Sequence, residues 1–177
     1  NCSLKVGDNI TTDHIMPAGA KILPLRSNIP AISKYCFTVC DEEFPARAEK
    51  LGQSIIVGGS NYGQGSSREH AALAPLQLGV KGVIAISFAR IHMANLINNG
   101  ILPLTFADSE DYNKLDMLDD LVIENCRKQV EDAVEGKLVV VKNITKGTQF
   151  NAVLSITNRQ AGMLLAGGLL KYTRERS

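Results

Sequence analysis

The chain has 177 residues, a length that fits one domain burying roughly 70% of the surface that its unfolded form exposes. Its 45% hydrophobic and 21% charged residues exclude a disordered or fibrous chain. A net charge of +1 and an aromatic content of 5% argue against nucleic acid or an anionic membrane as partners, so any anion must be bound locally.

The sequence predicts no membrane anchor and no metal site of its own. Its apolar stretches fall short of the ~20 residues that cross a bilayer, and the first residues lack the pattern of a secretory signal. The missing initiator Met indicates a domain excised from a larger protein. We expect Cys2, Cys36, Cys40 and Cys126 to be free thiols of a cytoplasmic protein. Cys36 and Cys40 have the wrong spacing for zinc and are too few for an iron–sulfur cluster.

The first part of the chain contains a long connection followed by alternating elements. Four prolines and few periodic residues between Pro17 and Pro45 predict a loop, and loops of such length are usually functional. After it, apolar runs alternate with helical patterns, which is typical of a parallel sheet covered on both faces. The expected strands are residues 55–57, 83–86 and 102–106, and the expected helices are residues 68–78 and 91–97.

The last part of the chain predicts short strands and a closing helix. Strands are expected at residues 121–123, 138–141 and 149–156, with turns near Gly136 and Gly147. An amphipathic helix follows Thr157 or Asn158, either of which can cap it. The expected fold class is therefore α/β, a single domain over residues 1–177 with a central, mostly parallel sheet and a smaller antiparallel layer.

A glycine-rich segment joins the strand at 55–57 to the helix at 68–78. Glycines allow close approach of a ligand, and a helix N-terminus favours an anion. Ser66 and Ser67 add hydroxyl groups, and Arg68 adds a planar fork that matches a carboxylate or phosphate. An equally open alternative is that Ser66 or Ser67 only caps the helix, with Glu69 completing a capping box. The arginine at 68, where a dinucleotide motif needs glycine, disfavours nucleotide binding.

Other catalytic readings of these residues are weaker. Ser66, His70 and Asp13 supply the residue types of a serine hydrolase, but no Gly-x-Ser-x-Gly elbow surrounds Ser66. His14 and His70 are too few for a zinc site. We expect His92 to be a half-buried packing residue and leave it out of the site.

A second polar segment covers residues 8–19. It predicts either a turn with local Asx and Thr hydrogen bonds or the edge of a site. Lys21 and Arg26 follow in the proline-rich connection, where a lone arginine is by itself most simply a solvated charge.

Four stretches of the chain carry a family pattern. They are Thr11-Thr12-Asp13-His14-Ile15, residues 61–72, Ser87-Phe88-Ala89-Arg90-Ile91-His92, and residues 102–108. Together they resemble the swivel domain of the aconitase family, and the match spans nearly the whole chain. The run at residues 65–70 is shared with the small subunit of isopropylmalate isomerase, whereas the first and last stretches favour aconitase. The resemblance implies a three-layer swivelling β/β/α domain.

The resemblance also implies an activity. Aconitases are hydro-lyases that interconvert citrate and isocitrate through cis-aconitate at a [4Fe-4S] cluster, whose cysteines belong to the other domains. The chain would then bind its tricarboxylate substrate only when docked on cluster-bearing domains of the same polypeptide or on a separate large subunit. The alternatives are the small subunit of an isopropylmalate or homoaconitate-type isomerase and, from another class, an RNA-binding regulator related to apo-aconitase.

The site residues follow from the same resemblance. Ser66 is expected to be the base that removes the proton beside a carboxylate. A neutral serine is a poor base unless amides and a guanidinium stabilise its alkoxide, and this loop supplies both. Lys21 competes with Arg26 for the role of the bidentate carboxylate-binding cation. The residues that the resemblance assigns to substrate binding are Asp13, Arg26, Ser67 and Arg68.

Overall fold

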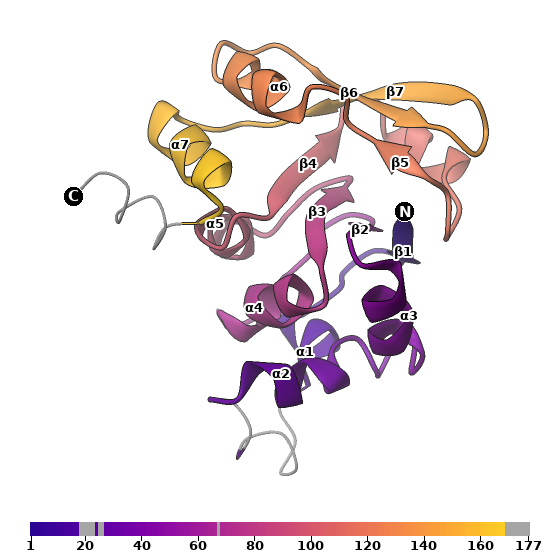
Figure 1. The fold of residues 1–177 in the computed structure, drawn as a ribbon, viewed down its shortest axis with the longest axis vertical. Coiled ribbons are helices and arrows are strands. Elements are labelled where there is room, and N and C mark those ends of the chain that lie inside the picture. The colour runs from indigo at the N-terminus through magenta and orange to yellow at the C-terminus, as the bar shows by residue number, and fades with distance from the viewer. Residues whose placement is uncertain (18–23, 25–26, 67, 169–177) are drawn as a thin grey trace.

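The computed structural model describes residues 1–17, 24, 27–66 and 68–168. One seven-stranded sheet runs through the molecule in the order β1-β2-β3-β4-β7-β6-β5 (Figure 1). The strands are β1 (Cys2–Lys5), β2 (Ser54–Val57), β3 (Val80–Ala85), β4 (Leu102–Phe106), β5 (Leu121–Val122), β6 (Val139–Asn143) and β7 (Thr148–Val153). The helices are α1 (Thr12–Ile15), α2 (Ile29–Ile32), α3 (Phe44–Leu51), α4 (His70–Gln77), α5 (Arg90–Asn98), α6 (Cys126–Ala133) and α7 (Asn158–Ala166), with 3-10 helices η2 (Ser33–Tyr35) and η3 (Ser109–Lys114).

The expected division into a parallel and an antiparallel part is confirmed. Strands β1 to β4 are parallel, and β7, β6 and β5 continue the sheet in antiparallel pairs. The two parts are joined where Thr105 and Phe106 of β4 pair with Val153 and Ala152 of β7. The smaller layer is therefore a continuation of the same sheet. Figure 1 shows the antiparallel strands and α6 at one end of the molecule and α1 to α4 at the other.

Two hydrophobic clusters cover the two faces of the parallel strands. Because successive side chains of a strand point to opposite faces, Ile56 and Val83 belong to the cluster formed with α1 to α4. Their neighbours Val57 and Ile84 belong to the cluster formed with α6, α7 and the antiparallel strands. This arrangement explains why the apolar runs of the parallel strands are almost uninterrupted.

The proline-rich connection is more structured than the sequence predicts. Residues 29–35 form α2 and η2, and α3 begins at Phe44, so the expectation of one long loop is wrong there. Asn28 caps α2 by accepting the N–H of Ala31 at 3.2 Å, and Pro30 lies in the first turn, where proline is tolerated. The N–H of Phe37 donates to the carbonyl of Ile15 at 2.8 Å, which joins the chain after η2 to the end of α1.

The closing helix begins as expected. Thr157 is the N-cap of α7, and its side chain and that of Gln160 form a reciprocal capping box. The four cysteines are free thiols, as predicted, with Cys2 and Cys36 buried and Cys40 exposed. None of the helices in the described part of the chain is long and apolar enough to cross a membrane.

A buried carboxylate ties the loop after η3 to the β6–β7 turn. Asp119 is 4% exposed and accepts the Asp116 N–H at 3.0 Å and the Asn143 amide at 2.8 Å, with the Lys146 ammonium at 3.3 Å. Burial acts to raise the pKa of Asp119, but these three donors outweigh it and hold the pKa below its usual value.

Replacing Asp119 with Asn should destabilise the fold by about 1–3 kcal/mol at pH 7, because the buried donors lose their charged acceptor. Since the folded pKa is lowered, this stabilisation exists above the unfolded pKa of about 4 and disappears as the pH falls through the folded pKa. Urea unfolding of both proteins from pH 7 to pH 2 measures the difference. Asp120→Asn is the control, because the hydrogen bonds described for Asp120 involve its backbone. A constant difference across this pH range would contradict the prediction.

Candidate functional site

The glycine loop, residues 58–68, leaves β2 beside the segment that follows β1. The N–H of Gly63 donates to the carbonyl of Ile10 at 2.6 Å, and the N–H of Thr12 donates to the carbonyl of Gln64 at 2.9 Å. These bonds hold the start of α1 against the middle of the glycine loop. The carboxyl ends of parallel strands, where this contact lies, are the usual position of ligand sites in α/β folds.

The other side of the glycine loop is bound to the segment between β3 and α5. The N–H of Tyr62 donates to the carbonyl of Ser87 at 3.0 Å, and the N–H of Ala89 donates to the carbonyl of Tyr62 at 2.9 Å. The glycine loop therefore runs between the other two segments like a short additional strand. Three of the stretches that carry the family resemblance thus form one continuous structure.

Ser66 lies on the exposed part of the glycine loop. The interpretation of Ser66 as a helix cap is wrong: α4 begins at His70, its N-cap is Glu69, and no side chain caps it. The expected helix start at Arg68 is accordingly a little early. Gly65 has φ +106°, a conformation that side chains disfavour and that turns the chain just before Ser66. Ser66 is exposed and takes no part in starting the helix.

Arg68 and Asp13 form an ion pair across the site. The contact joins Arg68 Nη1 to Asp13 Oδ1, and the side chains are 31% and 66% exposed. Asp13 belongs to the first turn of α1, so the pair links this helix to the end of the glycine loop. An exposed pair contributes little stability, but it orients the guanidinium and leaves further N–H groups for a carboxylate.

His14 is part of the same turn, and the sequence analysis assigned it no role. Its Nδ1 accepts the N–H of Thr11 at 2.9 Å while the Thr11 hydroxyl accepts the N–H of His14 at 3.1 Å, a capping box. In the neutral ring the proton therefore lies on Nε2. The Thr-x-x-His spacing was the signal for this arrangement. A hollow of about 600 Å³ is lined by Thr11, Asp13, His14, Pro17, Val39 and Arg68.

The local-turn interpretation of the segment at residues 8–19 holds at Thr11, whose hydroxyl caps α1. Asp8 instead bonds outside the segment, because its carboxylate accepts the N–H of Ser60 at 2.7 Å. The same turn nevertheless contributes Asp13 to the site, so the two interpretations are compatible. Arg26, its competitor Lys21 and Ser67 lie outside the described residues.

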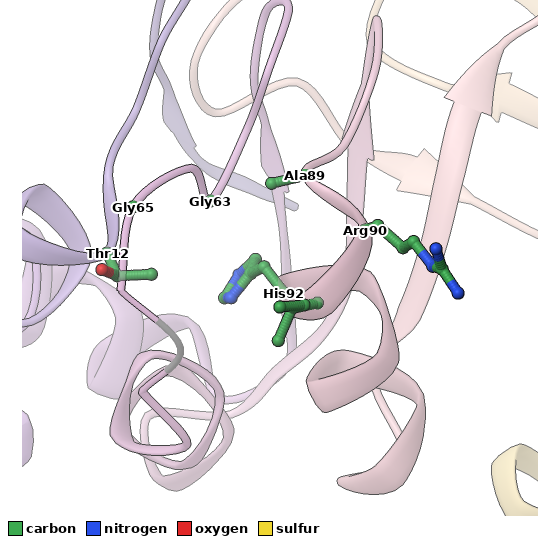
Figure 2. A pocket seen from close by; sticks show the side chains of 7 residues that line it. Thr12, Gly63, Gly65, Ala89, Arg90 and His92 are labelled. Atoms are coloured by element: carbon green, nitrogen blue, oxygen red, sulfur yellow. The ribbon is translucent and has the colours of Figure 1, made fainter.

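A second hollow, of about 510 Å³, lies on the α5 side of the glycine loop (Figure 2). It is lined by Thr12, Gly63, Gly65 and the first residues of α5. His92 is more buried than expected, with 2% of its surface exposed, and this burial lowers its pKa to about 4. The imidazole contacts the backbone of Gly63 so closely that a Cβ there would lie 2.3 Å from the ring.

The described residues do not offer the ligands of a cluster. Within the described ranges, no three or more His, Cys, Asp or Glu side chains are grouped so that they could hold a metal ion. Burial raises the pKa of the Cys36 thiol and that of the Cys2 thiol, the latter to about 11, which disfavours the thiolate that binds iron.

The chain is similar to known proteins over most of its length. Residues 32–109 match the aconitase C-terminal domain. The chain is 36% identical to a probable mitochondrial aconitate hydratase of Dictyostelium discoideum, over 97% of this chain and 25% of that protein. It is 39% identical to 3-isopropylmalate dehydratase small subunit 2 of Archaeoglobus fulgidus, over 97% of this chain and 92% of that protein.

A solved structure has the same fold. The 3-isopropylmalate dehydratase of Methanocaldococcus jannaschii superimposes with a TM-score of 0.78 at 30% identity, covering 97% of this chain and 90% of that one. The chain spans 16–25% of the aconitate hydratases that it matches and 77–96% of the small subunits. The chain therefore belongs to the aconitase C-terminal domain family, in the superfamily of aconitases and isopropylmalate dehydratases.

Proposed function

We propose that this chain is the substrate-binding and proton-abstracting domain of a hydro-lyase that acts on a hydroxy acid. The observation that carries the proposal is the exposed Ser66 on a glycine loop whose next described residue, Arg68, is oriented by Asp13. The relatives are hydratases and dehydratases, which supports the same reaction class.

In this proposal Ser66 acts as its alkoxide, whose Oγ takes the proton from the carbon beside a substrate carboxylate and becomes a neutral hydroxyl. The electron pair of that C–H bond forms the double bond as the hydroxyl group leaves as hydroxide, which takes up a solvent proton and departs as water. In the reverse reaction Ser66 returns its proton to the carbon. Arg68 binds the carboxylate and stabilises the charge that develops on it. The N–H groups of Ala71 and Ala72 donate to the carbonyls of Arg68 and Glu69, so it is the positive end of the α4 dipole that favours negative charge on the same loop.

Two substrate classes are supported about equally. The resemblance of residues 11–15 and 102–108, together with the aconitate hydratase relatives, favours citrate and isocitrate with cis-aconitate between them. The small-subunit relatives, which this chain covers almost completely, favour an isopropylmalate or homoaconitate-type isomerase. Near-neutral charge gives the RNA-binding alternative little support.

The proposal includes the assembly and its location. The chain would be one swivel domain over residues 1–177 that works against a [4Fe-4S]-bearing partner, either the rest of its own polypeptide or a separate large subunit. Its substrate would bind through Asp13, Arg26, Ser67 and Arg68, with Lys21 as the alternative to Arg26. A cytoplasmic location stays a prediction, because some of the relatives are named as mitochondrial.

The test is a comparison of substrates with the complete, cluster-loaded enzyme. We expect kcat/KM for citrate and isocitrate to exceed that for isopropylmalate if the aconitase assignment is right, and the opposite order if the chain is an isomerase subunit. The purified 177-residue chain alone should turn over neither. Turnover of citrate by the isolated chain would refute the proposal that the activity requires a partner.

Replacing Arg68 with Lys should lower kcat/KM about ten- to hundredfold, because the ammonium keeps the charge but loses the planar fork, which costs about 1.5–3 kcal/mol of charge-assisted hydrogen bonding. Steady-state kinetics on the complete enzyme measures the loss. Arg127→Lys is the control, because Arg127 is an exposed residue of α6 that bonds the carbonyl of Leu165. Equal kcat/KM values for the two variants would refute a substrate-binding role for Arg68.

A further inference from the structure

The hollow on the α5 side of the glycine loop lies at the N-terminus of α5, which no side chain of the described residues caps. Strand β3 is followed by α5, a helix of nine residues, and its N-cap is Ala89, which has extended geometry and no side-chain oxygen. The first N–H groups of a helix have no acceptor within the helix, and they carry its positive partial charge. Ala89, Arg90, Ile91 and His92, the start of this helix, all line the hollow. This end of the hollow therefore favours a negative group.

The side chain of His92 gives independent evidence for a ligand. It is 2% exposed, and neither ring nitrogen has a hydrogen-bond partner in the part of the chain that the structure describes. Figure 2 shows the imidazole extending from α5 into the space bordered by Thr12 and Gly65. A neutral imidazole carries one N–H donor, and a buried donor without an acceptor costs free energy. Both nitrogens are themselves covered, so an acceptor in the hollow would remove this cost once the ring turns to meet it.

The charges around the hollow select the sign of the ligand. No acidic side chain is among the described residues that line it. Asp13, next to Thr12 in sequence, lines the other hollow and is paired with Arg68. The Arg90 side chain points away from His92 in Figure 2, so it adds positive charge nearby without occupying the hollow. A cation would find no carboxylate among the described lining residues, whereas an anion meets helix N–H groups and an imidazole N–H.

The hollow also adjoins the proposed base. Gly65, which borders it, immediately precedes Ser66, and Gly63 borders it on the same loop. Exposed Ile91 adds an apolar rim, which suits the carbon chain of an organic acid better than a fully hydrated inorganic ion. An acid group held at α5 would thus lie beside the loop that removes the proton.

We propose that the hollow at the N-terminus of α5 binds a carboxylate of the organic-acid substrate, with the first-turn N–H groups of α5 and the imidazole of His92 as donors. This inference rests on the proposed function, because it takes the anion to be part of the hydroxy-acid substrate. It makes His92 a specificity-determining residue of the same site, on the side of the glycine loop opposite to Arg68.

The test replaces His92 with Phe, which keeps a ring against Gly63 and removes the donor. In the complete enzyme KM for the preferred hydroxy acid should rise about tenfold or more, with kcat nearly unchanged, because the lost bond serves binding. Calorimetric titration with tricarballylate, an unreactive tricarboxylate, should show the same loss of affinity. His92→Gln, which retains an N–H donor, should recover most of it.

Met93→Leu is the matched control, because Met93 is the next residue of α5 and packs against the opposite cluster. Unchanged KM and tricarballylate affinity in His92→Phe would overturn the inference, as would a loss that appears only in kcat. Inorganic phosphate serves as a second probe, and binding of phosphate that does not compete with tricarballylate would overturn the assignment to a substrate carboxylate. If the enzyme turns over no hydroxy acid, the proposed function fails, but the tricarballylate titrations still decide whether His92 binds a carboxylate.

Discussion

Replacing Ser66 with Ala is expected to lower kcat about 10²–10⁴-fold while KM changes little. The range is the usual contribution of a positioned general base, and the methyl group of alanine can take no proton. Binding should survive because Arg68 and its partner Asp13 remain in place. Single-turnover measurement of cis-aconitate or isopropylmaleate formation by the complete enzyme isolates the proton-removal step.

The fold should be unaffected by this change. Ser66 is exposed and does not cap α4, so circular dichroism and thermal unfolding of Ser66→Ala should match those of the parent enzyme. Ser60→Ala is the matched control on the same loop, because the hydrogen bonds described for Ser60 use its backbone. If the Ser66→Ala enzyme has the same kcat as the Ser60→Ala enzyme, Ser66 is not the base that removes the proton.

Replacing Gly63 with Ala is expected to damage both stability and activity. Gly63 has φ +87°, and an added Cβ would lie 2.3 Å from the imidazole of His92. The left-handed conformation alone costs about 1–2 kcal/mol for a residue with a side chain, and the displaced ring adds to this. Because a shift of about 1 Å in a catalytic loop can cost 10²-fold in rate, we expect kcat/KM to fall by about that factor.

Urea unfolding and steady-state kinetics measure the two effects of Gly63→Ala. Gly7→Ala is the control, because no atom lies within 4 Å of a Cβ added at Gly7. The double variant Gly63→Ala, His92→Gly should recover part of the lost stability, since it removes both the ring and the His92 Cβ, which would lie 2.5 Å from the added Cβ. If the double variant is as unstable as the sum of its single variants, the contact between Gly63 and His92 is not the cause.

The sequence predicts the elements that are long or strongly marked. The apolar runs of β2, β3 and β4 are those of strands in a sheet buried on both faces, and Thr157 is a recognisable N-cap of α7. Apolar patterns and capping residues are therefore enough to predict these elements. Strand β1 and helix α2 have four residues each, but β1 ends in a charged residue and α2 contains Pro30, so neither shows the plain apolar run that marks β2 at the same length. Helix α6 begins after Asn125 in a left-handed conformation and without a side-chain cap, so no start signal marks it.

The candidate site depends on contacts that are distant in sequence. The segments that carry Asp13 and Arg68 leave the same edge of the sheet because β1 pairs in parallel with β2, and this brings the two side chains together. No local sequence pattern predicts that pairing. The glycine loop was recognisable from its composition, but its bonds to the other two segments were not. The sequence predicts His92 to be a packing residue only. That Gly63 lies against its ring is visible only in the folded structure.

The contact between Ile15 and Phe37 fixes the C-terminal end of α1. The N–H of Phe37 donates to the carbonyl of Ile15 at 2.8 Å, while the N–H of Thr12, at the other end of the helix, donates to the carbonyl of Gln64 at 2.9 Å. Both ends of this short helix are bound to other segments, so Asp13 between them is held in place. A group that is positioned before a ligand arrives loses less conformational entropy on binding.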